Sequence, residues 1–271
     1  MNRILFETDE IVNGVAAFGG ERAEHVLNIL HGEVGQVLKT GEVNGLIGTS
    51  EILSIEQSEQ SGQSNNCRIS VRCSHTEKSI LPWIDLILAP PRPRVMKRLL
   101  PQLATMGVGR IFLVGAKKVE KDFWGATLLK PENYRPLLID GLMQAGTSIL
   151  PTLETRRNFR KFVKDELDAL WPEAERIVAH PYGAGEDFRR KTEDFRGLET
   201  LDGSRGLKSK VLSPSPRPVL AIGPEGGWTD EEVALLEEHG FARYSLGSRI
   251  LRTDTATIAL LAQLMKEFGS C

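Results

Sequence analysis

The sequence predicts an α/β protein of two domains, a β-rich domain over residues 1–76 and a parallel-sheet domain over residues 77–271. Three observations support this fold class. The length of 271 residues suits one large domain or two modest ones. Short apolar runs between closely spaced glycines fill the first part, which is typical of a small barrel or sandwich. After the first domain, strand-like runs alternate with helical ones, which indicates a parallel sheet with helices on both faces.

The composition excludes several classes of protein. Hydrophobic residues make up 41% and charged residues 26%, so the chain can bury a core. A net charge of -2 excludes a uniformly basic coat for nucleic acid, although a local basic patch remains compatible with it. The three cysteines fit neither a disulfide scaffold nor a zinc site. The chain lacks a signal-peptide pattern and any apolar run of ~18 residues, so we expect a cytoplasmic protein without membrane or metal.

The β-rich part is expected to contain four strands and one helix. The helix is predicted over residues 21–30, because Ala23, Val26, Leu27 and Leu30 recur at helical spacing. The polar segment 56–66 is predicted to be a hairpin loop. The apolar runs predict strands at residues 4–6, 36–39, 46–53 and 68–72.

The second part is expected to alternate between the two kinds of element. Strands are predicted at residues 84–89, 110–114, 176–179, 219–222 and 244–246. Helices are predicted over residues 95–106, 133–144, 159–171, 230–239 and 255–268. Residues 182–218 are charged and poor in aliphatic side chains, which predicts an exposed insertion.

The segment GPEGG at 223–227 leaves a buried strand and leads into a helix whose start is marked by Thr229 and Glu232, a capping-box pair. Its glycines permit positive φ angles and let a ligand approach the backbone. The spacing matches neither a Walker A loop nor the G-x-G-x-x-G fingerprint. A plain turn followed by a helix cap is the alternative.

The segment LGSRILRTDTA at 246–256 leads from a strand into the last helix, which Thr253 or Asp254 can cap. Apolar residues are unusual in loops, and Ile250 and Leu251 either sandwich a flat adenine ring or fill the core. Its arginines either meet phosphate or are solvated. A third strand, 176–179, ends in His180-Pro181, which is a weak signal alone.

Together these three segments resemble the S-adenosylmethionine loops of the SPOUT methyltransferases, and in particular the RsmE family (ribosomal RNA small-subunit methyltransferase E). The resemblance implies a SPOUT-type trefoil-knotted parallel sheet, a PUA-like N-terminal β-barrel and a homodimer. It implies methyl transfer from S-adenosylmethionine to N3 of a uridine in 16S ribosomal RNA, free or in the small ribosomal subunit. The alternatives are a SPOUT methyltransferase of another RNA site (a ribose hydroxyl or transfer RNA) and a divergent, non-catalytic RNA-binding protein.

The resemblance also implies a set of site residues. Arg252, and secondly Arg249, are expected to supply the cation that stabilises charge developing on the uridine. For Glu225 and Asp254 two roles remain as alternatives: a base that removes the uridine proton, or a carboxylate that braces the loops. Contacts to the methyl donor are expected from His180, Pro181, Ile222, Gly223, Pro224, Glu225, Gly226, Gly227, Leu246, Gly247, Ile250, Leu251, Thr253, Asp254 and Ala256.

Residues 92–121 carry eight lysines and arginines, including Arg110 and Lys121, against the single acid Glu120. Such segregation fits a phosphate-binding surface, with a solvated helix face as the alternative. The RNA-binding candidates are Arg3, His25, His31, Arg92, Arg94, Lys97, Arg98, Lys117 and Lys118.

The chain departs from the family pattern at several positions. His31 stands where arginine is usual, and Gln144 is kept while its usual acidic and arginine companions are replaced by Met143 and Thr147. Asp254 stands in place of the usual glutamate. Most departures lie outside the loops assigned to the methyl donor, so donor binding is better supported than the target nucleotide.

Overall fold

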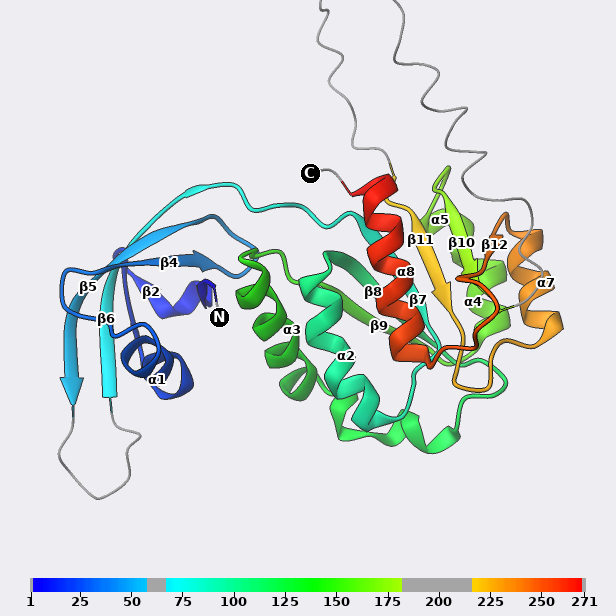
Figure 1. Cartoon of the computed structure of the whole chain (residues 1–271), viewed down its shortest axis with the longest axis horizontal. Coiled ribbons are helices and arrows are strands. Elements are labelled where there is room, and N and C mark those ends of the chain that lie inside the picture. The colour runs from blue at the N-terminus through cyan, green and yellow to red at the C-terminus, as the bar shows by residue number, and fades with distance from the viewer. Residues whose placement is uncertain (1, 58–66, 182–215, 270–271) are drawn as a thin grey trace, which may run out of the picture. The chain divides into compact units, whose positions relative to one another are not determined.

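The computed structural model describes residues 2–57, 67–181 and 216–269 (Figure 1). Most of the predicted loop 56–66 and of the predicted insertion 182–218 therefore lies outside the described residues. The chain forms two compact units. The first comprises Met1–Pro82, Leu100–Gly107 and Lys130–Pro151, and the second comprises Trp83–Leu99, Val108–Leu129 and Thr152–Cys271.

The first unit contains a six-stranded sheet with the order β1-β4-β5-β6-β3-β2. β1 pairs parallel with β4, and the other neighbours are antiparallel. Its ends, β1 and β2, do not pair with one another within the described residues, so the sheet is open there. The strands are β1 (Ile4–Phe6), β2 (Ile11–Val12), β3 (Val15–Phe18), β4 (Val37–Glu42), β5 (Ile47–Gln57) and β6 (Cys67–Glu77).

The four predicted strands are confirmed, but β2 and β3 are additional. They form a hairpin around Asn13 and Gly14, which both have positive φ, 52° and 77°. Asn-Gly is the sequence signal for such a turn, and the prediction missed it because the flanking strands are so short. Helix α1 (Gly20–Asn28) buries Ala23 and Val26. The predicted extension to Leu30 is wrong, because the helix ends at Asn28.

The second unit contains a six-stranded sheet with the order β12-β10-β11-β7-β8-β9, in which all neighbouring strands are parallel. The predicted parallel sheet is thus confirmed. β9 was not predicted, because polar and charged residues dominate its sequence. The strands are β7 (Ile84–Leu88), β8 (Val108–Val114), β9 (Thr152–Arg156), β10 (Arg176–Ala179), β11 (Val219–Ile222) and β12 (Ala242–Tyr244).

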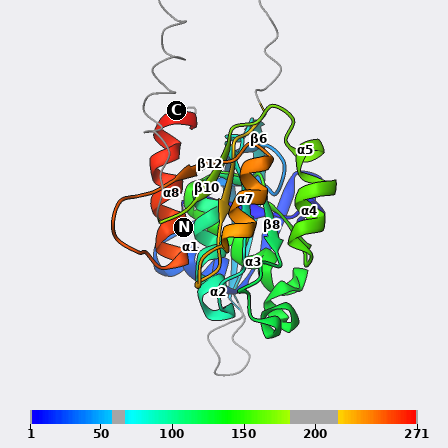
Figure 2. The same cartoon turned by 90° about the vertical axis from the view of Figure 1, so that its right-hand side faces the viewer.

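The remaining elements are α-helices and short 3₁₀ helices. Figure 2 shows α8 on the opposite side of this sheet from α4 and α5, while α4, α5 and α7 share one apolar cluster with the strands. The helices are α2 (Pro93–Thr105), α3 (Pro131–Ala145), α4 (Phe159–Asp165), α5 (Leu167–Leu170), α7 (Asp230–Glu238) and α8 (Thr253–Phe268). The 3₁₀ helices are η1 (Thr8–Glu10), η2 (Lys121–Gly125) and η3 (Thr127–Leu129).

The prediction of one helix over 159–171 is wrong. The helix is interrupted at Glu166, with φ -119° and ψ -33°, which is at once the C-cap of α4 and the N-cap of α5. The Glu166 carboxylate accepts a hydrogen bond from Arg156 at 2.7 Å. After the break, Trp171 is buried and packs its ring edge against Phe112, with 5.1 Å between centroids.

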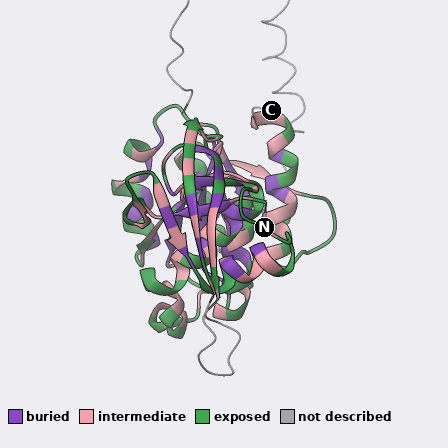
Figure 3. Cartoon of the chain, turned by 90° about the vertical axis from the view of Figure 1, so that its left-hand side faces the viewer, coloured by how far each residue is buried: buried purple, intermediate pink, exposed green. Residues whose placement is uncertain are grey.

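Buried residues follow the strands and the inner faces of the helices, whereas loops and outer faces are exposed (Figure 3). Two acids are buried among the described residues: Glu232, at 8% exposure, and Asp85 in β7. Asp85 is fully buried, and it accepts hydrogen bonds from Arg110 Nε at 2.7 Å and Trp171 Nε1 at 2.8 Å. Arg110 is therefore occupied by a core carboxylate, and counting it in an exposed basic surface is wrong.

Among residues 2–57, 67–181 and 216–269, no helix has both the length and the apolar character needed to cross a membrane. In the same ranges, no three or more histidines, cysteines and acids gather where they could share a metal ion.

Candidate functional site

The three segments singled out in the sequence follow three adjacent strands. β10 lies between β12 and β11, with Ala179 opposite Tyr244 and Val178 opposite Ala221. Because all three strands are parallel, residues 180–181, 223–229 and 245–252 leave the same edge of the sheet. The backbone N–H of His180 donates to the carbonyl of Tyr244 at 3.0 Å. The prediction that these strands lie side by side is confirmed.

The loop after β11 is fixed by its own backbone. Gly227, at φ 72°, donates its N–H to the carbonyl of Pro224 at 2.8 Å and closes a turn. A Cβ at Gly223 would lie 3.0 Å from the Trp228 ring, so this buried ring would have to shift to admit a side chain there. The predicted capping box is present: Thr229 Oγ1 accepts from the Glu232 N–H at 3.3 Å, and Glu232 Oε2 accepts from the Thr229 N–H at 2.9 Å.

The loop after β12 exposes its apolar residues. Leu246, Ile250 and Leu251 are 36%, 73% and 37% exposed, so they do not fill the core as the alternative required. Their backbone N–H groups make no backbone hydrogen bond within the described residues. Gly247 has φ 113°, a conformation that side chains rarely adopt. This loop therefore offers apolar surface and free backbone groups to a ligand.

The start of α8 differs from the prediction. The N-cap position falls on Arg252, whose side chain makes no capping hydrogen bond, so capping by Thr253 or Asp254 is wrong. Thr253 is buried at the first helical position, and its carbonyl accepts from Thr257 Oγ1 at 2.7 Å. Ala256 donates its backbone N–H to the carbonyl of Arg252 at 2.8 Å.

Two acids of these loops are ion-paired with arginines that follow β7. Glu225 Oε2 lies 3.3 Å from Arg92 Nε, and Asp254 Oδ2 lies 3.1 Å from Arg98. This pairing favours the bracing role for both carboxylates. By contrast, Arg249 and Arg252 are exposed and form no ion pair within the part of the chain that the structure describes.

The other basic candidates of the second unit also lie near the carboxyl ends of strands. Arg94 and Lys97 are exposed on the first two turns of α2, which follows β7. Lys117 and Lys118 are exposed after β8, and Lys118 Nζ donates to the carbonyl of Gly226 at 2.8 Å. The exposed cations thus share an edge of the sheet with the three loops.

Of the three RNA-binding candidates in the first unit, Arg3 is engaged in hydrogen bonds within the fold. The Arg3 guanidinium donates to the backbone carbonyls of Thr40 at 2.6 Å, Gly48 at 2.9 Å and Gly146 at 3.0 Å. His25 has its Nε2 atom buried without a hydrogen-bond partner among the described residues. His31 is exposed at φ 49°. Their RNA-binding role stays a prediction.

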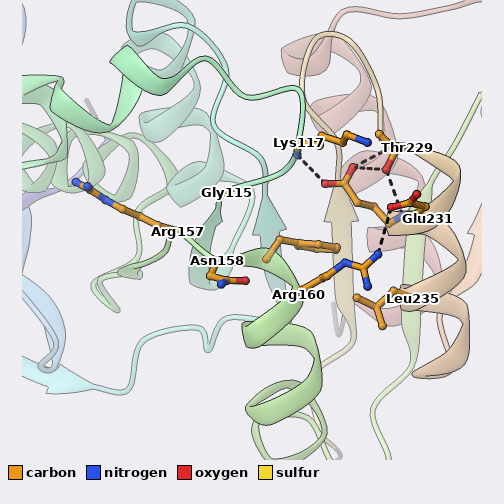
Figure 4. A pocket seen from close by; sticks show the side chains of 10 residues that line it. Gly115, Lys117, Arg157, Asn158, Arg160, Thr229, Glu231 and Leu235 are labelled. Carbon is orange, nitrogen blue, oxygen red and sulfur yellow. Dashed lines mark hydrogen bonds and ion pairs between the residues drawn. The ribbon is translucent and has the colours of Figure 1, made fainter.

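Sequence reasoning missed a cavity of about 330 Å³ at the same edge of the sheet (Figure 4). An ion pair of 3.2 Å between Arg160 and Glu231 joins α4 to α7 beside it, and the Arg157 side chain extends away (Figure 4). Among its residues, Lys117 had been named as an RNA contact, and Thr229 and Glu232 as a helix cap. The four residues 157–160 follow the unpredicted strand β9 and had not been assigned to a site. Its lining comprises Gly115, Lys117, Arg157, Asn158, Phe159, Arg160, Thr229, Glu231, Glu232 and Leu235.

Comparison with known proteins identifies the family. The chain matches the RNA methyltransferase domain family over residues 77–265. It is 29% identical over 269 residues to ribosomal RNA small subunit methyltransferase E of Treponema pallidum, covering 98% of this chain and 91% of that protein. The protein of the same name from Mesomycoplasma hyopneumoniae is 47% identical over 185 residues, which cover 68% of this chain and 70% of that protein. A ribosomal RNA small subunit methyltransferase E from Neisseria gonorrhoeae, solved bound to S-adenosyl methionine, has a similar fold with a TM-score of 0.66, at 20% identity over 99% of this chain and 98% of that one. The chain therefore belongs to the RsmE family of ribosomal RNA small subunit methyltransferases.

Proposed function

We propose that the chain transfers a methyl group from S-adenosylmethionine to N3 of a uridine in 16S ribosomal RNA. The observation that carries this proposal is the pair of glycine-containing loops, 223–227 and 246–252, which leave one edge of a parallel sheet on either side of β10. Ligands of open α/β sheets bind at that edge. The relatives are ribosomal RNA methyltransferases by name, and the Neisseria structure contains S-adenosyl methionine.

The residues at this edge fit an adenosyl group. Ligand pockets are mostly apolar with a few well-placed polar groups. Leu246, Ile250 and Leu251 supply exposed apolar surface and backbone N–H groups that make no backbone hydrogen bond within the described residues. Gly226 is exposed without a side chain, and its carbonyl accepts from Lys118 Nζ at 2.8 Å. We assign the methyl donor to these residues together with the other loop positions named above, from His180 to Ala256.

S-adenosylmethionine supplies a sulfonium methyl that is already electrophilic, so the chain has to orient the uridine and control its N3 proton. That proton has a pKa well above neutrality, so either a base removes it or a cation stabilises the developing anion. We assign the cation to Arg252 and secondly to Arg249, which are exposed and outside ion pairs in the described residues. Glu225 and Asp254 are already paired with arginines, which supports a bracing role.

The wider architecture that we propose is the one that the resemblance to the SPOUT methyltransferases implies. The exposed cations after β7 and β8 would bind the phosphates of the RNA. A trefoil knot around the loops, a PUA-like role for the first sheet, a boundary between domains near residue 76, a homodimer and a cytoplasmic location are further parts of the proposal.

The replaced family positions favour a second candidate. His31, Met143 and Thr147 stand where the family usually has arginine, acid and arginine. A chain that binds the methyl donor but modifies another RNA site, or none, would be compatible with those changes.

Nucleoside analysis separates these functions. Small ribosomal subunits, 16S RNA and transfer RNA from a strain lacking the gene are incubated separately with the protein and labelled S-adenosylmethionine. Each RNA is then digested to nucleosides and analysed by mass spectrometry. We expect label in N3-methyluridine. Label in a ribose or in transfer RNA would support the alternative target, and bound donor without incorporated label would identify a non-catalytic RNA-binding protein.

A further inference from the structure

We propose that Arg92 and Arg98 are positioning residues for the two loops assigned to the methyl donor, rather than only RNA contacts. The inference rests on the proposed function of those loops. Both arginines lie on the segment that follows the carboxyl end of β7, and β7 pairs with β11 in the sheet. Each is paired with an acid of a different loop: Arg92 with Glu225 after β11, and Arg98 with Asp254 after β12.

The two ion pairs tie together segments that are distant in the chain. Arg98 and Asp254 are 156 residues apart, and their pair connects the second turn of α2 to the first turn of α8. Arg92 and Glu225 connect the start of the same segment to the GPEGG turn. One short segment therefore holds both loops through two carboxylates.

The local backbone explains why the loop after β12 needs an outside anchor. Leu246, Ile250 and Leu251 form no backbone hydrogen bonds through their N–H groups within the described residues, and the Arg252 side chain does not cap α8. The Asp254 carboxylate is 23% exposed, more sheltered than the 64% exposed Arg98 side chain that reaches it. We infer that the Asp254 carboxylate is held in place on α8 and that Arg98, by pairing with it, orients the first turn of α8.

The neighbouring cation Arg94 provides a matched comparison. It lies on the same helix and is exposed, but it forms no ion pair within the described ranges. If the basic segment served RNA alone, Arg94 and Arg98 would have equivalent effects. If Arg98 positions the loop, its loss affects the methyl donor even when no RNA is present.

The test is isothermal titration of S-adenosylmethionine into the RNA-free protein. Exposed ion pairs are individually weak, so we expect Arg98→Gln and Arg92→Gln each to weaken the affinity about two- to five-fold. Arg98→Lys, which keeps the charge, should recover most of the loss. The double variant Arg98→Gln with Asp254→Asn should be no weaker than Asp254→Asn alone, because the two side chains act as one unit.

Arg94→Gln is expected to affect RNA binding and not the binding of S-adenosylmethionine. It should weaken binding of a 16S RNA fragment and leave the affinity for S-adenosylmethionine within error of the wild type. Equal affinities of Arg94→Gln and Arg98→Gln for S-adenosylmethionine would overturn the inference. Additive losses in the Arg98 and Asp254 double variant would also overturn it.

Hydrogen exchange distinguishes a failure of this inference from a failure of the proposed function. If the wild type bound no S-adenosylmethionine, the proposed function would be wrong, yet the ion pair could still be tested on the ligand-free protein. We then expect faster amide exchange in peptides covering 246–260 of Arg98→Gln than in those of Arg94→Gln. Identical exchange in the two variants would overturn the positioning role.

Discussion

Asp85 shows how a single charged residue is accommodated in the core of the second unit. Its side chain is fully buried, and it is surrounded by donors: the Arg110 guanidinium and N–H, Trp171 Nε1, and Arg217 at 3.0 Å. A buried carboxylate is tolerated only when its oxygens are satisfied in this way. No local pattern in the sequence reveals these partners, because Arg110 is 25 residues away and Trp171 is 86. This is why Arg110 was misassigned to the basic surface.

Replacing Asp85 by alanine should destabilise the second unit strongly. Breaking a buried ion pair leaves its partners unpaired and costs about 3–5 kcal/mol. Urea unfolding followed by tryptophan fluorescence measures the loss. Glu231→Ala is the control, because the Arg160–Glu231 pair lies in the same unit and is exposed, with 3.2 Å between its atoms. A similar small effect of both substitutions would contradict the role of Asp85.

His75 should make the first unit sensitive to pH. Burial is the main cause that lowers the pKa of His75; the charge of Arg3 acts in the same direction and that of Glu42 against it. The folded state therefore binds fewer protons than the unfolded state near the ordinary histidine pKa of ~6.5, and stability falls as pH decreases through that range. We expect the urea midpoint to fall between pH 7.5 and pH 5.5 in the wild type, and to fall less in His75→Gln. Equal decreases would exclude His75 as the cause.

Gly226→Val should abolish binding of S-adenosylmethionine without unfolding the protein. An added Cβ at Gly226 meets only the flexible Lys118 side chain, at 3.1 Å, so the fold can adjust, whereas a valine covers the backbone that the ligand would approach. Isothermal titration measures the loss, and circular dichroism checks the fold. Gly125→Val is the control, since a Cβ there meets nothing within 4 Å. Retained affinity in Gly226→Val would place the ligand elsewhere.

The secondary elements divide into those with a strong local signal and those without one. β7 and β11 are continuous apolar runs that were predicted nearly to the residue. β9 reads TLETR, and its polar composition hides a strand that only its pairing with β8 reveals. The same omission concealed the cavity beside Asn158. Local pattern therefore predicts buried strands well and polar edge strands poorly.

The capping box of α7 was correctly predicted, and its contribution to the free energy of unfolding should be measurable. Thr229→Ala removes the acceptor of the Glu232 N–H, and the loss of such a cap costs about 1 kcal/mol. Thr229→Ser keeps the hydroxyl and should retain most of the stability. The difference between the two variants in urea unfolding measures the cap. No difference would show that the cap contributes nothing to the stability of the unit.

In the molecule as a whole, the sequence predicted the parallel sheet but not the order of its strands. The order β12-β10-β11-β7 arises from pairings between residues 43 to 134 positions apart, which local periodicity does not contain. That order brings the two glycine-containing loops to one edge and places the segment of Arg92 and Arg98 beside them. The resemblance of the loops to a known family had anticipated their proximity, but the ion pairs that join them were visible only in the structure.

A crystal structure of the chain with S-adenosylmethionine tests the central claim most directly. We predict density for the adenosyl group between loops 223–227 and 246–252, in contact with the backbone of Gly223 and with Leu246 and Leu251. Density at another place, such as the cavity lined by Lys117 and Arg160, would contradict the assignment of these loops to the methyl donor.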